Sequence, residues 1–484
     1  MRSLKLLFLF LLSCQTTVLS AATIMSYWTN WSIYSNDPTT RAIPEPAYGM
    51  PGSYDAAGAI VNNPDMSEKV NYLDSLTYAF FEVQPNGMIY FSDPNADLRL
   101  SDPADKYNTD EFCSAAATSA ICNYKQKAAT WGRGNFNLGF VNLQNIRGLH
   151  KIISIGGYGH DASMEYAFAS SENTSNFVNS IAALKGNYPI SGVGLDYEPP
   201  SITSEQAAKY TNLIQTLRNK LEPETVINIT ILANPDWINT FGQNNWKIIS
   251  LAVNNINVMT YDFHGAFDYP ESTGFLANLY IDPNDTHTNK FSVDTAITAL
   301  INNGVPSNKI IVGIPAYGRA LEGASNVNYG LYQPFSKIPK GDLDPKDCSQ
   351  VLPLAANGCA GSYQYKYIIG NMINPGVAFT DHSVLTQGVT SGVWAYDSNI
   401  WIDTVGNQLS QTFISYDNVV SVKAKAEYVK NKNLAGIMIW ELRGDIAPSD
   451  PSKASLLAAI ADVLGIQPKE HVKEEHTYTK KDEL

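Results

Sequence analysis

Two acidic residues separated by one position are the part of this sequence best suited to chemistry. Asp196 and Glu198 close a short apolar run, which Pro199 and Pro200 then end abruptly. Side chains alternate between the two faces of a strand, so both carboxylates would point the same way from its C-terminal end. Such a pair is commonly just solvated, but its apolar neighbours indicate a buried strand, where an unpaired carboxylate is costly. The spacing therefore indicates a functional pair of carboxylates.

Eight short runs rich in β-branched and aromatic residues recur along the chain, with helix-like segments between them. This pattern is typical of repeated βα units, and we expect an α/β fold, a (β/α)8 TIM barrel. Active sites of such barrels lie at the C-terminal ends of the strands, where Asp196 and Glu198 would be. The predicted strands are 23–28, 76–81, 151–157, 192–198, 226–231, 256–261, 309–314 and 435–440.

Two intervals between these strands are too long for one helix and its loops. Residues 93–148 are expected to form loops on the barrel rim. Residues 320–391, rich in Tyr, Gly and Pro, are expected to form a small inserted α+β subdomain between the seventh and eighth strands. The barrel would span 23–466. Residues 467–484 are polar and charged without an apolar period, which predicts a solvated tail.

Both ends of the chain carry targeting signals. Residues 1–22 combine basic residues, a short apolar run and small residues, the order of a cleavable signal peptide, and no membrane span is expected. An alternative is a lipoprotein signal that anchors the chain through Cys14. The last four residues match an address read by the retrieval receptor of the endoplasmic reticulum, which predicts residence in its lumen. They are Lys481, Asp482, Glu483 and Leu484.

Four cysteines remain after removal of the signal peptide, in two close-spaced pairs. In an oxidising lumen this number favours two disulfide bonds, although the sequence alone permits three pairings. Metal binding is disfavoured because no histidine or further cysteine lies at ligand spacing. The disulfide candidates are Cys113, Cys122, Cys348 and Cys359.

Glycosylation motifs occur at four asparagines. Asn173, Asn228 and Asn284 could carry glycans in a eukaryotic host. Asn30 closes an apolar strand and is expected to carry none. The net charge is −13, and no basic block precedes the tail, so a nucleic-acid partner is not expected.

The segment that holds Asp196 and Glu198 resembles the signature strand of family 18 glycoside hydrolases, which carries three aspartates and a glutamate. With further family motifs, the resemblance runs from Ser26 to Glu441 and covers nearly the whole mature chain. Within the family, residues 261–268 are most similar to processive bacterial chitinases and their insect-virus relatives. The other motifs are Ser154-Ile155-Gly156-Gly157, Met259-Thr260-Tyr261-Asp262-Phe263, Tyr317-Gly318-Arg319 and Gly436-Ile437-Met438-Ile439-Trp440-Glu441.

The resemblance implies a retaining, substrate-assisted hydrolysis of β-1,4-linked N-acetylglucosamine polymers. Glu198 would protonate the glycosidic oxygen while the acetamido oxygen of the sugar attacks the anomeric carbon. Asp196 would orient the acetamido N–H, and the Tyr261 hydroxyl would bind the acetamido oxygen. To act as an acid near neutrality, Glu198 must have a raised pKa, which a partly apolar site and the charge of Asp196 would supply.

The resemblance also implies a sugar-binding groove, in which Trp440 would form the floor under the distorted sugar. Tyr27, Phe80, Asp262 and Arg319 would line this position, and Trp31, Tyr158 and Phe267 would stack outer sugars. Glu441 would bind a sugar hydroxyl or form a buried ion pair with an arginine. The full set of expected substrate-binding residues is Tyr27, Trp31, Phe80, Tyr158, Met259, Asp262, Phe267, Tyr317, Arg319, Trp440 and Glu441.

The sequence departs from the family pattern at two positions. Gly194 and Ser191 stand where the family has aspartates, so Asp196 lacks the carboxylate with which it would share a proton. We expect a displaced pH optimum rather than loss of activity, because the groups that touch the reacting atoms remain.

Two other functions stay open on the same barrel. One is a chitin-binding lectin, favoured by the missing aspartates and disfavoured by the presence of Glu198. The other is an endo-β-N-acetylglucosaminidase acting on N-glycans, disfavoured by the inserted subdomain and the candidate stacking aromatics. The expected partners are chitin and chitooligosaccharides; no cofactor or metal is implied, and a monomer is expected.

Overall fold

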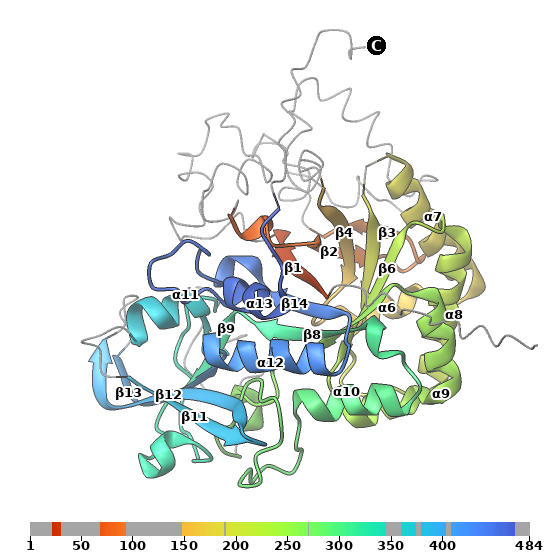
Figure 1. The fold of residues 1–484 in the computed structure, drawn as a ribbon. Helices are drawn as coiled ribbons and strands as arrows, with labels where there is room; N and C mark the ends of the chain where they lie inside the picture. The colour runs from red at the N-terminus through yellow and green to blue at the C-terminus, as the bar shows by residue number, and fades with distance from the viewer. Residues whose placement is uncertain are drawn as a thin grey trace, which may run out of the picture.

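Eight parallel strands form a closed barrel (Figure 1). Their order is β1-β14-β8-β7-β6-β5-β4-β2, and pairing of β2 with β1 closes the ring. All eight predicted strands are present. They are β1 Thr23–Thr29, β2 Ser75–Val83, β4 His150–Gly156, β5 Gly192–Asp196, β6 Val226–Leu232, β7 Asn255–Met259, β8 Ile310–Pro315 and β14 Gly436–Trp440. The computed structural model describes residues 22–30, 68–92, 148–187, 190–269, 271–344, 360–373, 379–402 and 408–469.

Helices cover the outside of the barrel (Figure 1). Reciprocal hydrogen bonds fix the start of the helix that follows β5. The Thr203 hydroxyl accepts from the backbone N–H of Gln206, and the Gln206 side chain accepts from the backbone N–H of Thr203. This capping box starts α8, whose apolar side is buried. The helices are α6 Asp161–Tyr166, α7 Ser171–Asn187, α8 Ser204–Lys220, α9 Pro235–Ala252, α10 Val293–Asn302, α12 Val419–Asn431 and α13 Leu456–Leu464.

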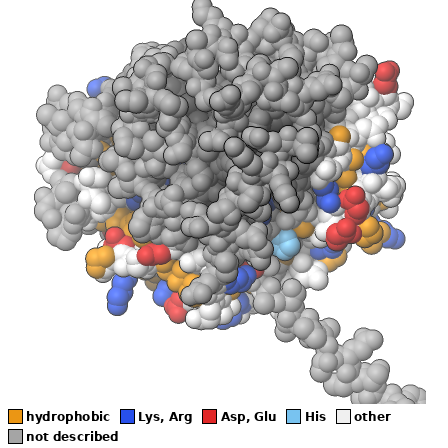
Figure 2. All heavy atoms as spheres, turned by 90° about the horizontal axis from the view of Figure 1, so that it is seen from above, with side chains coloured by type: hydrophobic (Ala, Val, Ile, Leu, Met, Phe, Trp, Pro, Cys, Tyr) orange, Lys and Arg blue, Asp and Glu red, His pale blue; other side chains and the backbone are white. Residues whose placement is uncertain are grey.

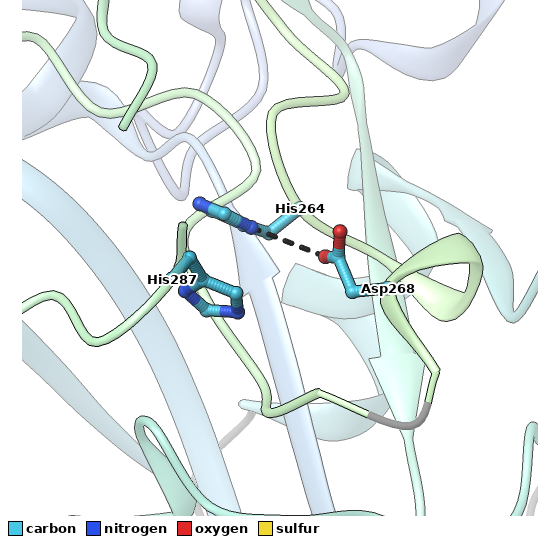
Figure 3. Close-up of side chains that lie close together, drawn as sticks. All are labelled: His264, Asp268 and His287. Carbon is cyan, nitrogen blue, oxygen red and sulfur yellow. Dashed lines mark hydrogen bonds and ion pairs between the residues drawn. The ribbon is translucent and has the colours of Figure 1, made fainter. Parts of the chain in front are cut away.

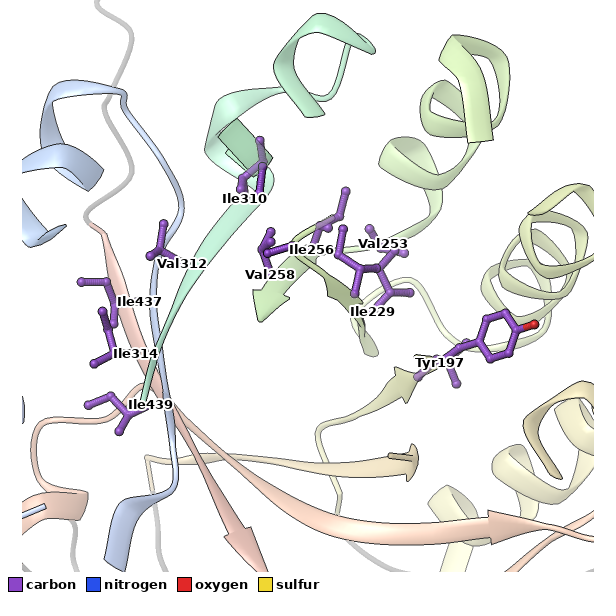
Figure 4. Packing of buried hydrophobic residues seen from close by; sticks show 14 of the residues in the cluster. Tyr197, Ile229, Val253, Ile256, Val258, Ile310, Val312, Ile314, Ile437 and Ile439 are labelled. Carbon is purple, nitrogen blue, oxygen red and sulfur yellow. The ribbon is translucent and has the colours of Figure 1, made fainter. Parts of the chain in front are cut away.

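The main apolar core lies between the strands and the helices. Alternate residues of the strands, such as Ile229, Val258 and Val312, point into this layer and are fully buried (Figure 4). The residues between them point into the barrel. Several of these are small or polar, among them Gly194 and Asn228. The barrel interior is thereby available to polar groups that shape a site.

A second, antiparallel sheet follows β8 in the chain. It has the order β10-β9-β13-β12-β11, and all its strands lie between β8 and β14 in the chain. We expected a subdomain at 320–391, but this sheet begins three residues earlier and continues past residue 391, because the motif around Arg319 forms a strand of its own. Its strands are β9 Tyr317–Leu321, β10 Ser362–Gln364, β11 Thr380–Thr386, β12 Val389–Ile402 and β13 Gln408–Tyr416.

Several predictions concern residues outside the described ones: the signal peptide, the rim loops at 93–147, the four cysteines, Trp31 and the last four residues. Within the described ranges, no helix is long and apolar enough to cross a membrane. The face in Figure 2 shows acidic and basic side chains interspersed around the margin of the described part.

The glycosylation prediction was wrong for Asn228. This side chain is 1% exposed inside the barrel, where no glycan fits. Asn173 is also a poor acceptor, because its side-chain amide donates to the carbonyls of Pro85 and Tyr166. Asn284 is exposed. The motif alone does not distinguish a strand that faces the barrel interior from a surface loop.

The strand that carries Asp196 requires glycine at position 192. A Cβ there would lie 2.2 Å from the carbonyl oxygen of Val226 on β6, whereas a Cβ at Gly186 on α7 would meet nothing within 4 Å. We expect Gly192→Ala to lower the free energy of unfolding by about 2 kcal/mol or more. Gly186→Ala should change it by less than about 1 kcal/mol. Urea unfolding of both variants measures the difference; equal stabilities would contradict the packing described.

Candidate active site

The end of β5 directs two carboxylates into the mouth of the barrel. Asp196 is 2% exposed, and Glu198, two residues later, is half-buried. Tyr197 between them points outward (Figure 4), where its ring packs on Phe168 and Tyr210 with centroids 5.5 and 5.0 Å apart. The alternation seen in the sequence thus separates the packing residue from the two acidic residues.

Burial and mutual repulsion hold protons on this pair. Burial raises the pKa of Asp196 by more than the neighbouring Glu198 and Ser154 lower it. Burial likewise raises the pKa of Glu198 well above its usual value, and the charge of Asp196 raises it further. Ionising both carboxylates together is therefore unfavourable. The raised pKa favours the protonated form of Glu198, as a proton donor requires.

Asp161 is a third acidic residue at this site, and the sequence reasoning missed it. It begins α6, and its Oδ1 accepts from the backbone N–H of Glu198 at 2.9 Å. Its charge also raises the pKa of Glu198 and Asp196. Its position after β4, the third barrel strand of the chain, was a usable signal, since the segments that follow neighbouring strands meet at one end of a barrel.

Aromatic rings line the mouth beside the carboxylates. Trp440 stacks on Phe80 with centroids 5.7 Å apart and an interplanar angle of 22°. The ring centroids of Tyr27 and Trp440 are 5.0 Å apart, and the Tyr27 hydroxyl is 2.8 Å from the Thr230 hydroxyl. Tyr261 is buried nearby with its ring against Tyr317. These rings form an apolar floor with hydroxyl groups at its edge, which suits the faces and hydroxyls of a sugar.

Arg319 and Asp262 form a bidentate ion pair at the rim. The Arg319 Nε and Nη2 atoms lie 2.6 and 2.7 Å from the two Asp262 carboxylate oxygens. The Tyr317 hydroxyl donates to the same carboxylate at 2.9 Å, and Arg319 Nη1 donates to the Ser362 hydroxyl on β10 at 3.0 Å. This network fixes the second sheet against the barrel mouth. The charge of Asp262 also raises the pKa of Glu198.

The remaining predicted binding residues differ in exposure. Tyr158 is 89% exposed and Phe267 is 51% exposed, so both rings can meet a ligand. Met259 is half-buried against the cluster that contains Tyr261. Trp31 lies outside the described residues.

Glu441 adopts the second of the two roles left open by the sequence. Arg443 donates to Glu441 Oε1 from Nε at 2.8 Å and from Nη2 at 2.7 Å. The other oxygen accepts from the Thr29 hydroxyl at 3.3 Å. With both residues buried, this ion pair braces the ends of β14 and β1 beneath Trp440.

Comparison with known proteins decides the family. The model of glycosyl hydrolases family 18 matches residues 23–445. The chain belongs to this family.

Relatives are similar over most of the chain. Endochitinase 1 of Metarhizium robertsii is 24% identical over 91% of this chain and 84% of its own length. Chitinase A1 of Niallia circulans is 28% identical over 73% of this chain and 47% of its own. Among solved structures, chitinase ChiA74 from Bacillus thuringiensis aligns with a TM-score of 0.68 and 24% identity, covering 94% of this chain and 71% of that chain. The last likeness supports the barrel fold.

The departure from the family-18 pattern at Gly194 leaves room beside Asp196. A Cβ at Gly194 would lie 3.6 Å from the Ser154 hydroxyl, an ordinary contact. Ser154 Oγ and Asp196 Oδ1 are both buried without a hydrogen-bond partner. The Cβ of an aspartate at 194 therefore meets only ordinary contacts, and its carboxylate would add negative charge next to the pair.

We predict that Gly194→Asp displaces the alkaline limb of the pH–activity profile. The added charge raises the pKa of the carboxylate pair, so the proton needed for catalysis is lost at higher pH, by roughly one unit. Gly194→Ala, which adds a methyl group without charge, should leave the limb in place. Initial rates on soluble chitin oligosaccharides across pH measure both; coincident limbs for all three proteins would contradict the prediction.

Proposed function

We propose that this protein hydrolyses chitin and chitooligosaccharides with Glu198 as the general acid. The observation that carries the proposal is a half-buried carboxyl group of raised pKa beside a second buried carboxylate, at the mouth of a barrel floored by Trp440. A raised pKa is what a general acid needs. The names of the similar proteins, chitinases of bacteria and fungi, support the same substrate.

The reaction would follow the retaining, substrate-assisted course. Glu198 donates its proton to the glycosidic oxygen as the bond to the anomeric carbon breaks, and the acetamido oxygen of the same sugar attacks that carbon. The product is an oxazolinium ion and a shortened chain. Water, deprotonated by the Glu198 carboxylate, then attacks the same carbon, so that the original configuration is restored.

Neighbouring groups would stabilise the oxazolinium ion. Asp196 is the last residue of β5, two residues before the acid, where it can accept from the acetamido N–H and balance the developing positive charge. The Tyr261 hydroxyl donates to Met438 Sδ at 3.8 Å, and because a thioether sulfur is a weak acceptor, the hydroxyl can donate to the acetamido oxygen instead. Asp196 can play this part only as a carboxylate. The proton that the pair retains must therefore reside on Glu198.

The aromatic floor would select a sugar polymer. Trp440 and Phe80 offer stacked faces to the apolar side of a pyranose ring, and Arg319 with Asp262 offers polar contacts at the rim. Exposed Phe267 and Tyr158 extend the apolar surface away from the carboxylates. A groove of this kind suits several consecutive sugars.

Replacing the acid with its amide tests the proposal. We expect Glu198→Gln to lower turnover of chitin oligosaccharides by about 10²-fold or more, since an amide cannot supply the proton. Binding should survive because the aromatic floor is intact. Glu205→Gln, on the exposed surface of α8, is the matched control. Mass spectrometry of the products measures cleavage; oligosaccharide binding without cleavage by the parent protein would indicate a lectin instead.

A further inference from the structure

Two histidines and two aspartates form a buried cluster next to the barrel mouth, here called the His–Asp cluster. His264 and Asp268 follow β7, and Asp285 and His287 lie in the loop before α10. Each histidine is 4% exposed and Asp285 is 8% exposed. Figure 3 shows His264 and Asp268 in contact, with the His287 ring beside them. None of the four has a part in the hydrolysis proposed above.

The contacts run through the cluster as a chain. His264 Nδ1 is 3.1 Å from Asp268 Oδ2, and His264 Nε2 is 3.8 Å from Asp285 Oδ2. His287 Nδ1 is 2.7 Å from Asp285 Oδ1, and His287 Nε2 is 2.8 Å from the carbonyl oxygen of Ser272. Three of the four ring nitrogens thus have an oxygen within hydrogen-bond distance, whereas His264 Nε2, at 3.8 Å from Asp285 Oδ2, has no hydrogen-bond partner within the described residues. The position of His264 between the carboxylates of Asp268 and Asp285 favours its protonated form.

The pKa shifts within the cluster also favour a protonated His264. Burial lowers the pKa of His264, but the hydrogen bonds and charges of Asp268 and Asp285 outweigh it and raise the pKa to about 9. Burial raises the pKa of Asp285, but its contacts with His264 and His287 outweigh burial and hold it below the usual range. The charged form of His264 therefore stabilises the fold fully below the usual pKa of 6.5, and this contribution is lost as pH rises through about 9.

The two histidine rings of the cluster stack on each other. The His264 and His287 rings lie 3.7 Å apart at an interplanar angle of 28°. The bare backbone of Gly274 permits the stacking, since a Cβ there would lie 2.6 Å from His264 and 2.8 Å from His287.

The cluster is joined to the barrel mouth by a short turn. Asp268 Oδ2, the oxygen that faces His264, also accepts from the backbone N–H of Gly265 at 2.9 Å. The turn so closed, Gly265–Asp268, displays Phe267. It packs closely on Arg319, because a Cβ at Gly265 would lie 2.9 Å from Arg319 Cδ. The Arg319 guanidinium lies 6.0 Å from the centre of the Phe267 ring.

We propose that the His–Asp cluster positions the substrate groove: its paired charges hold the Gly265–Asp268 turn, and through it Phe267 and Arg319, in the arrangement that a sugar chain contacts. This inference rests on the proposed function.

Other ionisable groups also face the cluster. Tyr332 packs its ring 6.1 Å from His287 and donates to Asp282 at 2.9 Å, and the charge of Arg319 is paired with Asp262.

Replacing Asp268 with asparagine separates charge from shape. The amide oxygen can still accept from Gly265, but His264 loses one of its two carboxylates and so loses its proton at lower pH. Two readouts are needed between pH 6 and 10: KM and kcat on chitin oligosaccharides, and hydrogen exchange of the Gly265 amide in the protein without substrate. Asp462→Asn, in an exposed pair with Lys423 on the outer helices, is the matched control.

In the wild type we expect KM to rise above about pH 9. In Asp268→Asn the rise should begin at lower pH and make KM about tenfold higher near pH 8, with kcat within about twofold, because one charge-assisted hydrogen bond is weakened. The Gly265 amide should exchange faster in this variant and at the wild-type rate in Asp462→Asn. Superimposed KM profiles together with unchanged exchange would overturn the proposal.

A different pattern separates this proposal from the proposed function. A fall in kcat at every pH with unchanged KM would assign the cluster a merely structural role and also overturn the inference. If the wild type cleaves no chitin oligosaccharide, the proposed function fails. The Gly265 exchange then decides by itself whether the charges of the cluster hold the turn.

Discussion

The burial of two carboxylates at the end of one strand is the constraint on which the rest of the structure depends. Burial raises the pKa of both Asp196 and Glu198, and the charge of Asp196 raises that of Glu198 further, so ionising both together is unfavourable. The free energy that burial of these carboxyl groups costs is offset by the apolar layer packed between the strands and the helices. The interior holds small and polar residues beside a second apolar cluster that includes Met25, Ile311 and Met438, and the acid is retained where a reaction can use its proton.

The sequence was sufficient for the barrel because its signals are local. Each strand is a short run of β-branched residues, and period-two alternation correctly placed Tyr197 in the outer layer and the acidic residues inside. The second sheet was harder to delimit. Gly318 and Arg319 follow directly on the run that forms β8, and only pairing with β13 and β10 shows that they belong to the second sheet.

Contacts between distant segments could not be derived from one sequence. The hydrogen bond from Glu198 to Asp161, the approach of His287 to His264 and the buried state of Asn228 depend on how the strands and loops meet in space. The choice between two roles for Glu441 was decided by the position of Arg443. Residues of these types are common in proteins, so only their neighbours in the fold show what each one does. Asp262 is a further example, because it forms an ion pair with Arg319 and its charge raises the pKa of Glu198.

The central claim is that the fold keeps Glu198 protonated near neutral pH. The most direct measurement is a carbon-13 NMR titration of the glutamate carboxyl groups, with the Glu198 signal assigned by its absence in Glu198→Gln. The account predicts that this signal titrates well above the usual glutamate value of 4.5, together with Asp196. A Glu198 that titrates at the usual value, independently of Asp196, would contradict it.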